Sequence, residues 1–425
     1  MPSIFRCIRC GREYEPGSVF NCECGGLLEV IHEFLGWDRS IFDSRLCPMG
    51  PPFSSGVWRY KELIHPSLGV GMIVTRPEGN TNFYSSRMVS EYAEVNKLSM
   101  KHEGENPTGS FKDRGMTVAV SEAIRQGARN VACASTGNTS ASMAAYAAQA
   151  GLRGIVFIPE GEISYGKLSQ ALAYGSKVVQ IPGNFDDAMR IVQEASKSLG
   201  LYLLNSINPW RIEGQKSIVF ELLQQRGWEP PDWIVVPAGN LGNTSAFGKA
   251  LSELVDLGWI EKVPRIASIQ AEGAAPFYKL WKEGGSSLQS LKPETIATAI
   301  KIGNPVSWEK ALRVIKETDG VVEVVSDTEI MEAKAIVDRS GVGCEPASAA
   351  SVAGVRKLVA EGTIKSDDDV VCILTGNLLK DPDATIGYHT GKLKDLTPER
   401  PNAPIRLEAK SITASLRNIL GPVAT

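Results

Sequence analysis

The chain has 425 residues, of which 43% are hydrophobic and 22% are charged, so we expect neither disorder nor fibrous structure. Its formal net charge is -3 and no block of Lys or Arg stands out, which disfavours nucleic-acid and membrane partners. The sequence shows neither the apolar segment of a signal peptide nor the ~18 apolar residues that a membrane span requires. We therefore expect a cytoplasmic protein. We also expect two lobes, because single cores stop growing at about 250 to 300 residues.

A cluster of cysteines occupies the first predicted unit. Cys7 and Cys10 form Cys-x-x-Cys, and Cys22 and Cys24 follow in NCECGG, so four thiols lie within eighteen residues. This arrangement is typical of a small zinc ribbon, in which four thiolates bind one tetrahedral Zn²⁺ ion. The Cys22-x-Cys24 pair departs from a second Cys-x-x-Cys, so the pattern is equally compatible with cysteines that bind no metal.

The segment ENPTGSFKDRG joins a loop with Pro and Gly to a predicted helix. We expect Ser110 to cap this helix and Asp113 to complete a capping box, which places Lys112 in the first turn. The partial positive charge of a helix N-terminus disfavours an ammonium group, so it favours the neutral amine that a Schiff-base lysine needs. A lysine taken alone is far more often a solvated surface residue, and only the surrounding segment argues otherwise.

From about residue 131 onward, short β-branched segments alternate with Ala-rich or amphipathic ones. A strand at 131–134 precedes a helix ended by Gly151, and further helices are expected after Asn184 as N-cap and after a Ser326–Glu329 capping box. The other predicted strands are 154–158, 177–181, LYLL, 233–237, RIASIQ and VVCIL. This order predicts an α/β fold with parallel-rich sheets flanked by helices and with ligands at the carboxyl ends of the strands.

Two predicted strand–helix junctions are rich in groups that bind anions. Residues 134–139 (ASTGNT) bring hydroxyls and free N–H groups to a helix start, although an ordinary helix cap has the same composition. Residues 239–243 (GNLGN) follow a predicted strand, and their successive N–H groups can surround a phosphate. Nucleotide sites and plain tight turns use the same device, so this turn is informative only together with Lys112.

The lysine segment and seven further blocks resemble the threonine synthase family of tryptophan-synthase-like, fold type II pyridoxal-phosphate (PLP) enzymes. The blocks are ACASTGNTSAS, GNFDDA, NSINPWRIEGQKS, VPAGNLGN, ETIATAIKIGNP, GCEPASAA and LTGNLLKDP, in the family's order over roughly residues 75–390. The resemblance implies a two-lobed lyase that uses PLP to convert O-phospho-L-homoserine and water to L-threonine and phosphate. It also implies a homodimer.

The resemblance assigns the cofactor to four segments. Lys112 carries PLP as a Schiff base, Asn138 bonds the phenolic oxygen of its ring, and Thr375 faces its pyridine nitrogen. A Thr does not force that nitrogen to be protonated, which suits elimination and replacement rather than transamination. A Thr satisfied by its own backbone is the common alternative. The residues assigned to the cofactor phosphate are Gly239, Asn240, Leu241, Gly242 and Asn243.

The resemblance assigns the substrate to two other segments. The residues assigned to its carboxylate are Ser135, Thr136, Gly137 and Thr139. The residues assigned to its phosphate are Ser206 and Arg211 of NSINPWR. A guanidinium matches a phosphate dianion bidentately, so this last block separates phosphorylated from unphosphorylated substrates. An Arg near Trp210 could equally be a packed surface residue.

The predicted domains follow the same blocks: a zinc-ribbon-like segment (1–50), a large PLP-binding lobe (51–97 and 206–391), a small lobe (98–205) and a tail without assigned role (392–425). Asn82 stands where the family usually has Pro, which questions the local turn only. The alternatives are another type II enzyme, such as a cysteate synthase or a serine/threonine dehydratase, and a non-catalytic regulatory protein that binds PLP. The NSINPWR block disfavours the first and the intact catalytic set the second.

Overall fold

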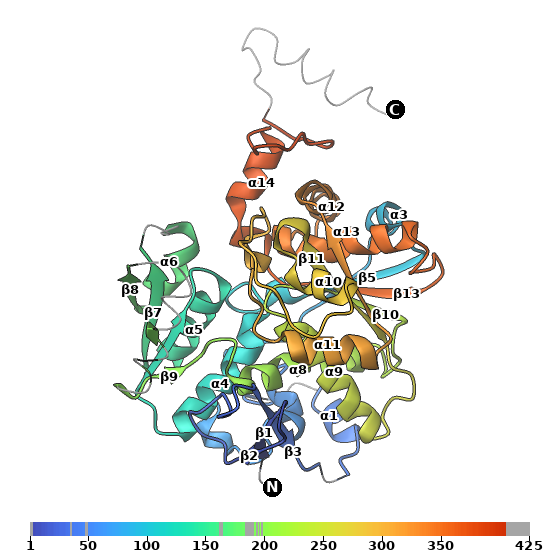
Figure 1. Ribbon diagram of the computed structural model, residues 1–425. Coiled ribbons are helices and arrows are strands. Elements are labelled where there is room, and N and C mark those ends of the chain that lie inside the picture. Colours follow the sequence, from blue (N-terminus) through green and yellow to red (C-terminus); the bar gives the residue numbers. More distant parts are fainter. Residues whose placement is uncertain are drawn as a thin grey trace.

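The computed structural model describes residues 3–34, 36–46, 50–160, 165–182, 191–192, 194, 196 and 199–404. The chain forms two parallel-rich sheets flanked by helices, with a small antiparallel ribbon beside them (Figure 1). This arrangement confirms the predicted α/β class. The start of the helix predicted at Asn184 and most of the predicted tail lie outside the described residues, whereas residues 191–192, 194, 196 and 199 of that predicted helix are helical.

The larger sheet has six strands in the order β12-β11-β10-β13-β5-β4. They are β4 (Phe83–Tyr84), β5 (Lys97–His102), β10 (Trp233–Pro237), β11 (Arg265–Ala271), β12 (Val321–Val325) and β13 (Asp369–Leu374). All neighbours pair in parallel except β4, which runs antiparallel to β5. Ile234 of β10 pairs with Ile266 on one side and Val371 on the other, in strands that are apolar and buried because helices cover both faces.

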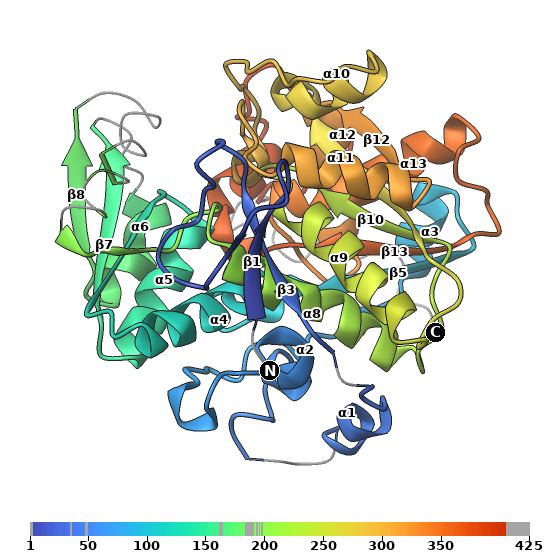
Figure 2. The same cartoon turned by 60° about the horizontal axis from the view of Figure 1, so that its bottom comes forward.

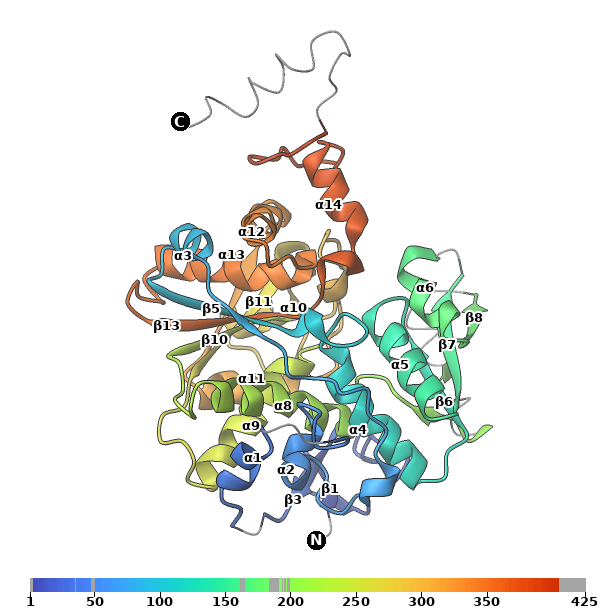
Figure 3. The same cartoon turned by 180° about the vertical axis from the view of Figure 1, so that it is seen from behind.

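Helices lie on both faces of this sheet (Figures 1 and 3). One face carries α3 (Arg87–Ala93), α12 (Asp327–Arg339) and α13 (Pro346–Ala360), and the other carries α8 (Pro209–Gln225), α9 (Gly242–Asp256) and α11 (Trp308–Glu317). The predicted capping box of α12 is confirmed, since Ser326 Oγ accepts from the Glu329 N–H and the Glu329 carboxylate accepts from the Ser326 N–H.

The smaller sheet has four parallel strands in the order β8-β7-β6-β9. They are β6 (Asn130–Ala134), β7 (Arg153–Pro159), β8 (Lys177–Ile181) and β9 (Tyr202–Leu203), with α5 (Asn138–Gln149) and α6 (Tyr165–Ala173) against them. α4 (Lys112–Arg125) lies between the two sheets and packs on α5 and α8 (Figure 3). The predicted lobe boundary at 97/98 assigns most of β5 to the small lobe, whereas β5 belongs to the larger sheet.

The ribbon consists of β1 (Ser3–Cys7), β2 (Glu13–Tyr14) and β3 (Leu28–His32), paired antiparallel in the order β2-β1-β3. In β1 and β3, buried residues alternate with half-buried ones, and the ribbon lies against α8 (Figure 2).

The remaining elements are α1 (Ser40–Ser44), α2 (Lys61–Ile64), α10 (Pro276–Lys282), α14 (Pro382–His389) and short 3₁₀ turns at Trp58–Tyr60, Val70–Met72, Glu103–Glu105, Glu272–Ala274, Thr298–Ile300 and Leu378–Lys380. In the described part of the chain, no helix has the length and apolar character needed to cross a membrane.

Candidate active site

Lys112 is the first residue of α4, which confirms its predicted place in the first turn. The segment before it is held against the end of β13, because Ser110 pairs with Gly376 in an antiparallel bridge and the Phe111 N–H donates to the Thr375 carbonyl at 3.0 Å. Lys112 therefore lies at the carboxyl end of a central strand, which is where α/β sheets bind ligands.

The predicted capping box of α4 is wrong. Phe111 is the N-cap residue, no side chain caps the helix, and Ser110 Oγ is buried without a partner among the described residues. Asp113 instead accepts hydrogen bonds from the Thr108 N–H (2.7 Å) and from Ser142 Oγ (2.5 Å). The physical reason is that the bridge to Gly376 fixes the Ser110 backbone against the chain after β13, while Thr108 and Ser142 occupy the Asp113 carboxylate.

The Lys112 ammonium has no carboxylate partner among the residues that the structure describes. It lies over the Phe111 ring, 3.9 Å from the centroid. Burial, followed by the charge of Arg211, lowers the pKa of Lys112 to about 7, although Glu345 acts in the opposite direction. Because of this shift, a large fraction of the amine is neutral near pH 7, as a lysine nucleophile and base requires.

Arg211 lies in the first turn of α8 and is only 3% exposed, so it is not the packed surface residue of the alternative interpretation. Its Nη1 donates to the Leu204 carbonyl at 3.2 Å, while its Nε has no partner in the described part of the chain. Burial lowers the pKa of Arg211 to about 10. A buried guanidinium without a counter-ion is costly, and an anionic ligand would supply the missing partner.

Asn138 follows β6 of the smaller sheet and Thr375 follows β13 of the larger sheet, and both side chains contact Glu345. Asn138 Nδ2, at the start of α5, donates to Glu345 Oε2 at 3.0 Å, and Thr375 Oγ1, after β13, donates to Glu345 Oε1 at 3.4 Å. Thr375 Oγ1 also lies 3.1 Å from Ser348 Oγ, so Thr375 is not satisfied by its own backbone alone. Burial raises the pKa of Glu345, which favours its neutral form.

Sequence reasoning missed Glu345. The residue stands in the GCEPASAA block, and it is the N-cap of α13 immediately before Pro346. A carboxylate directly before a helix-starting Pro was the available signal, but its contact with Asn138 depends on how the two sheets pack.

Residues 239–243 form a turn between β10 and α9. Leu241 adopts a left-handed conformation with φ 63°, and the N–H groups of Gly239, Asn240 and Leu241 have no acceptor in the residues described. Asn243 Oδ1 is buried and also unpartnered there. A Cβ at Gly239 would lie only 3.1 Å from Ile300 Cα, which is a tight contact. Glycine avoids this contact and leaves the N–H groups of the turn without a covering side chain. The turn therefore presents free N–H donors at a helix N-terminus, as an anion site does.

The residues assigned to the substrate carboxylate surround the start of α5. Gly137 is its N-cap residue, and the Gly137 N–H donates to Ser135 Oγ at 3.2 Å. Thr136 and Thr139 are half-buried at the same helix end. Ser206 is half-buried in the loop between β9 and α8, shortly before Arg211.

Asn82 forms two contacts that a Pro could not form. Its backbone N–H donates to Glu105 Oε2 at 2.7 Å, and its Nδ2 donates to Glu105 Oε1 at 3.2 Å. Both donors are absent from Pro. The departure from the family pattern is thus compensated locally by Glu105.

The described residues fit PLP. The N–H groups of the 239–243 turn, which have no acceptor among the described residues, suit the cofactor's phosphate. The Lys112 amine with its lowered pKa suits the aldehyde, and Asn138 with Thr375 suits the polar edge of the ring. The family model described as "Pyridoxal-phosphate dependent enzyme" matches residues 74–376, which include all of these positions. Fold and site thus define a PLP-dependent enzyme. The solved structure of maize serine racemase is similar in fold, with a TM-score of 0.62 and 20% identity over 86% of this chain and 97% of that one.

Two curated relatives define the family more narrowly. The chain is 47% identical to a threonine synthase of Methanocaldococcus jannaschii, over 90% of this chain and 94% of the relative. It is also 47% identical to a threonine synthase of Methanosarcina acetivorans, over 90% of this chain and 93% of the relative. The chain belongs to the threonine synthase family, as its motifs indicate.

Proposed function

We propose that the chain converts O-phospho-L-homoserine and water to L-threonine and inorganic phosphate. The observation that carries the proposal is the placement of Lys112, an amine with a lowered pKa, in the field of Arg211, a buried guanidinium that has no carboxylate partner among the described residues. A substrate with both an amino group and a phosphate matches this pair. The names of the relatives support the same reaction.

PLP, when bound, supplies a ring that accepts electrons from the carbon atoms next to an attached amino group. In our proposal Lys112 holds its aldehyde carbon, the 239–243 turn binds its phosphate, Asn138 donates to its phenolic oxygen and Thr375 faces its ring nitrogen. The carboxylate of the substrate lies at residues 135–139, at the N-terminus of α5, where the helix dipole favours an anion.

Lys112 moves the protons once its amine is free. The Nζ atom removes the proton from the α carbon and delivers it to the former aldehyde carbon of bound PLP, so that Nζ is free to remove a proton from the β carbon. A pKa of about 7 is near the optimum for a base that acts at neutral pH. Phosphate leaves with the electron pair of the Cγ–O bond, and Lys112 delivers the β proton to the γ carbon. The hydroxyl of water then bonds to the β carbon, and the α carbon regains its proton.

Arg211 and Ser206 hold the phosphate throughout. Because Arg211 Nε lacks a partner in the described part of the chain, a phosphate oxygen can satisfy it without displacing a native contact. The departing phosphate remains beside the β carbon and accepts the second proton of the attacking water. This balances the reaction without any additional acid or base.

Glu345 acts as a positioning residue in this proposal. Its carboxyl group accepts hydrogen bonds from Asn138 Nδ2 and from Thr375 Oγ1, so it can hold these two side chains at the ring. Truncation of Glu345 should therefore weaken cofactor binding more than it slows proton transfer.

One assay separates the proposal from its alternatives. Phosphate release and keto-acid formation are measured with O-phosphohomoserine, phosphoserine, serine and threonine on the PLP-loaded protein. We expect phosphate and threonine from O-phosphohomoserine only. Keto acid from serine or threonine would indicate a dehydratase, sulfite-dependent phosphate release from phosphoserine would indicate a cysteate synthase, and no turnover of any substrate would indicate a PLP-binding regulator.

The covalent lysine, the assembly and the compartment are tested separately. Borohydride reduction of the PLP-loaded protein followed by peptide mapping should label Lys112, and a label on another lysine would refute the assignment. We propose a homodimer in the cytoplasm, as in the family resemblance. Sedimentation equilibrium and cell fractionation test these two points.

A further inference from the structure

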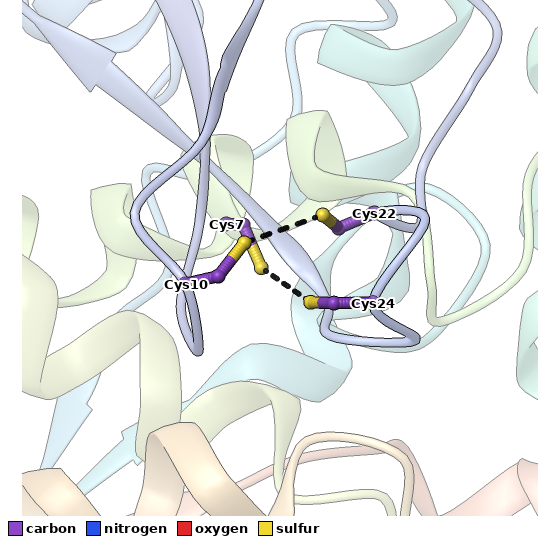
Figure 4. A group of neighbouring side chains, drawn as sticks. All are labelled: Cys7, Cys10, Cys22 and Cys24. Atoms are coloured by element: carbon purple, nitrogen blue, oxygen red, sulfur yellow. Dashed lines mark hydrogen bonds between the residues drawn. The ribbon is translucent and has the colours of Figure 1, made fainter.

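The four cysteines of the ribbon point toward one another from two loops (Figure 4). Cys7 Sγ lies 3.5 Å from Cys24 Sγ, and Cys10 Sγ lies 3.5 Å from Cys22 Sγ. All four sulfur atoms lie within 4.8 Å of one another. A tetrahedral zinc ion with Zn–S bonds of ~2.3 Å requires sulfur atoms roughly 3.8 Å apart, whereas a disulfide requires about 2.05 Å. The observed spacing therefore fits a shared metal ion.

The surroundings of the sulfur atoms suit thiolates. The Arg9 N–H lies 3.4 Å from Cys7 Sγ, and the Tyr14 hydroxyl lies 3.1 Å from Cys22 Sγ. Such donors to ligand sulfur are typical of the outer shell of a metal site. Gly26 belongs to the same geometry, because a Cβ there would lie 2.7 Å from Cys7 Sγ. The loops are thus shaped around the sulfur cluster.

The ribbon has little core of its own. Its strands comprise two of five residues and one of two, and its fully buried apolar side chains, such as Phe5 and Leu28, pack against the catalytic body. A segment of this size does not bury enough surface to fold alone, so a metal ion can supply a decisive part of its stability.

The ribbon is anchored by charged contacts to α11, a helix next to the candidate active site. Arg9 binds Glu309 of α11 at 2.8 Å, and Glu29 of β3 binds Arg313 of α11 at 2.8 Å. The Lys310 ammonium, also on α11, donates to the Leu28 carbonyl at 2.8 Å. The residues just before α11 contact the 239–243 turn, since the Ser307 N–H donates to the Asn240 carbonyl at 3.3 Å.

The ribbon also contacts residues that lie close to Arg211 in the sequence of α8. Trp210 is fully buried, with the ring of Phe5 from the ribbon 5.9 Å away and the ring of His65 stacked at 4.0 Å. His32 of β3 lies 2.9 Å from Glu213 on the next turn of α8. The ribbon therefore touches α8 on both sides of Arg211 in the sequence.

We propose that Cys7, Cys10, Cys22 and Cys24 bind one Zn²⁺ ion, and that this ion keeps the ribbon docked so that the first turn of α8 presents Arg211 correctly. The zinc ion is structural and takes no part in the chemistry. The metal site stands on its own, whereas its effect on Arg211 rests on the proposed function.

The metal is tested on the full-length PLP-loaded protein. After dialysis against EDTA, elemental analysis should find one zinc ion per chain, and C10S and C24S, which alter the two exposed cysteines, should each lose it. The control C133A removes a buried thiol of β6 and should keep the zinc. Protein without zinc, a disulfide in the non-reduced mass spectrum, or zinc retained in both serine variants would overturn the site.

A second measurement does not depend on whether the variants fold. Protein produced in cobalt-supplemented medium should bind one Co²⁺ per chain and show the visible bands of tetrahedral cobalt thiolate. Stoichiometric cobalt without these bands would refute the four-thiolate ligand set.

The positioning role is read from kinetics and from cofactor absorbance. For C10S and C24S we expect a several-fold rise in the KM for O-phosphohomoserine, with kcat and the visible PLP absorbance within about twofold of wild type. Loss of zinc without any change in KM would refute the positioning role while leaving the metal site intact. A chain that binds zinc but turns over no phosphorylated substrate would refute the proposed function and not the site.

Discussion

Helices α4 and α8 carry two buried groups of charges with opposite organisation. In the first, Arg114 binds Glu103 at 2.6 Å and Glu221 at 2.7 Å, and Lys101 binds Glu221 at 2.6 Å. In the second, Lys112 lies two residues before Arg114 and shares its site with Arg211. Neither of these two cations has a carboxylate within salt-bridge distance among the residues described.

The pKa values follow the pairing. Burial alone would lower the pKa of Arg114, but the charges of Glu103 and Glu221 outweigh burial and raise it. Burial outweighs the opposing charges of Glu345 on Lys112 and of Cys133 on Arg211, so the two pKa values fall to about 7 and about 10. The same two helices thus hold a paired ion network that joins elements of the fold and two cations that have no carboxylate partner in the described part of the chain. Both groups of charges are buried, so burial does not distinguish them. The group around Lys112 and Arg211 differs because its cations have no carboxylate partners among the described residues.

The largest expected effect is on Lys112. Lys112→Met should lower turnover by more than about 10³-fold, because proton transfer and cofactor attachment both require the amine. The folded pKa of about 7 lies below the ordinary value of 10.5, so the ammonium destabilises the fold fully below pH 7 and not above pH 10.5. PLP-free Lys112→Met should therefore melt above wild type at pH 6, with a difference that shrinks toward pH 10.5. A lower melting temperature at pH 6 would contradict this account.

The ion network should respond in the opposite way. Glu221→Gln leaves Arg114 and Lys101 without their shared carboxylate and should cost roughly 3 to 5 kcal/mol of unfolding free energy, measured by urea denaturation. Turnover per folded molecule should stay near wild type. The control Glu91→Gln breaks an exposed ion pair with Arg87 and should cost less than about 1 kcal/mol. Equal costs in the two variants would remove the contrast between the buried network and the surface.

Arg211 tests whether the second group of charges selects phosphate. Hydrogen bonds to charged groups contribute on the order of 1.5 to 3 kcal/mol, so Arg211→Ala should lower kcat/KM for O-phosphohomoserine roughly tenfold to a hundredfold or more. Any activity on unphosphorylated amino acids should fall far less. Arg211→Lys is the matched variant, since it keeps the charge but not the planar fork, and its loss should be intermediate. An equal loss on both substrate classes would mean that Arg211 supports only the fold.

Glu345 should give the smallest effect. Glu345→Gln keeps one acceptor oxygen for Asn138 or Thr375 and should change PLP affinity by less than about threefold. Glu345→Ala leaves Asn138 Nδ2 without this acceptor and should weaken PLP binding about fivefold to tenfold, in line with ~1 kcal/mol for one hydrogen bond. Titration of the PLP-free protein with PLP, followed by absorbance, measures both. If Gln is as damaging as Ala, the ionised carboxylate is the functional form.

Local pattern was sufficient for part of the candidate site. The first-turn position of Lys112, the 239–243 turn before α9 and the Ser326–Glu329 capping box were each predicted from neighbouring residues, and the structure has them as predicted. The capping box at Ser110 was wrong because the pairing with Gly376 comes from a distant segment. The lobe boundary at 97/98 cuts β5 for the same reason, since strand partners are chosen by packing across the sheet.

The sequence by itself therefore determined the α/β class, the first-turn position of Lys112 and the family, because these depend on residue types at short, fixed spacing. Only the tertiary structure decided which charges are paired. It brings Glu345 to Asn138, gives Glu221 to Arg114 and Lys101, and leaves Arg211 without a carboxylate in the described part of the chain. The physical reason is that pairing depends on which side chains approach within a few ångströms in a medium of low dielectric constant. That approach is set by the packing of α4, α8 and the two sheets, and no spacing along the chain encodes it.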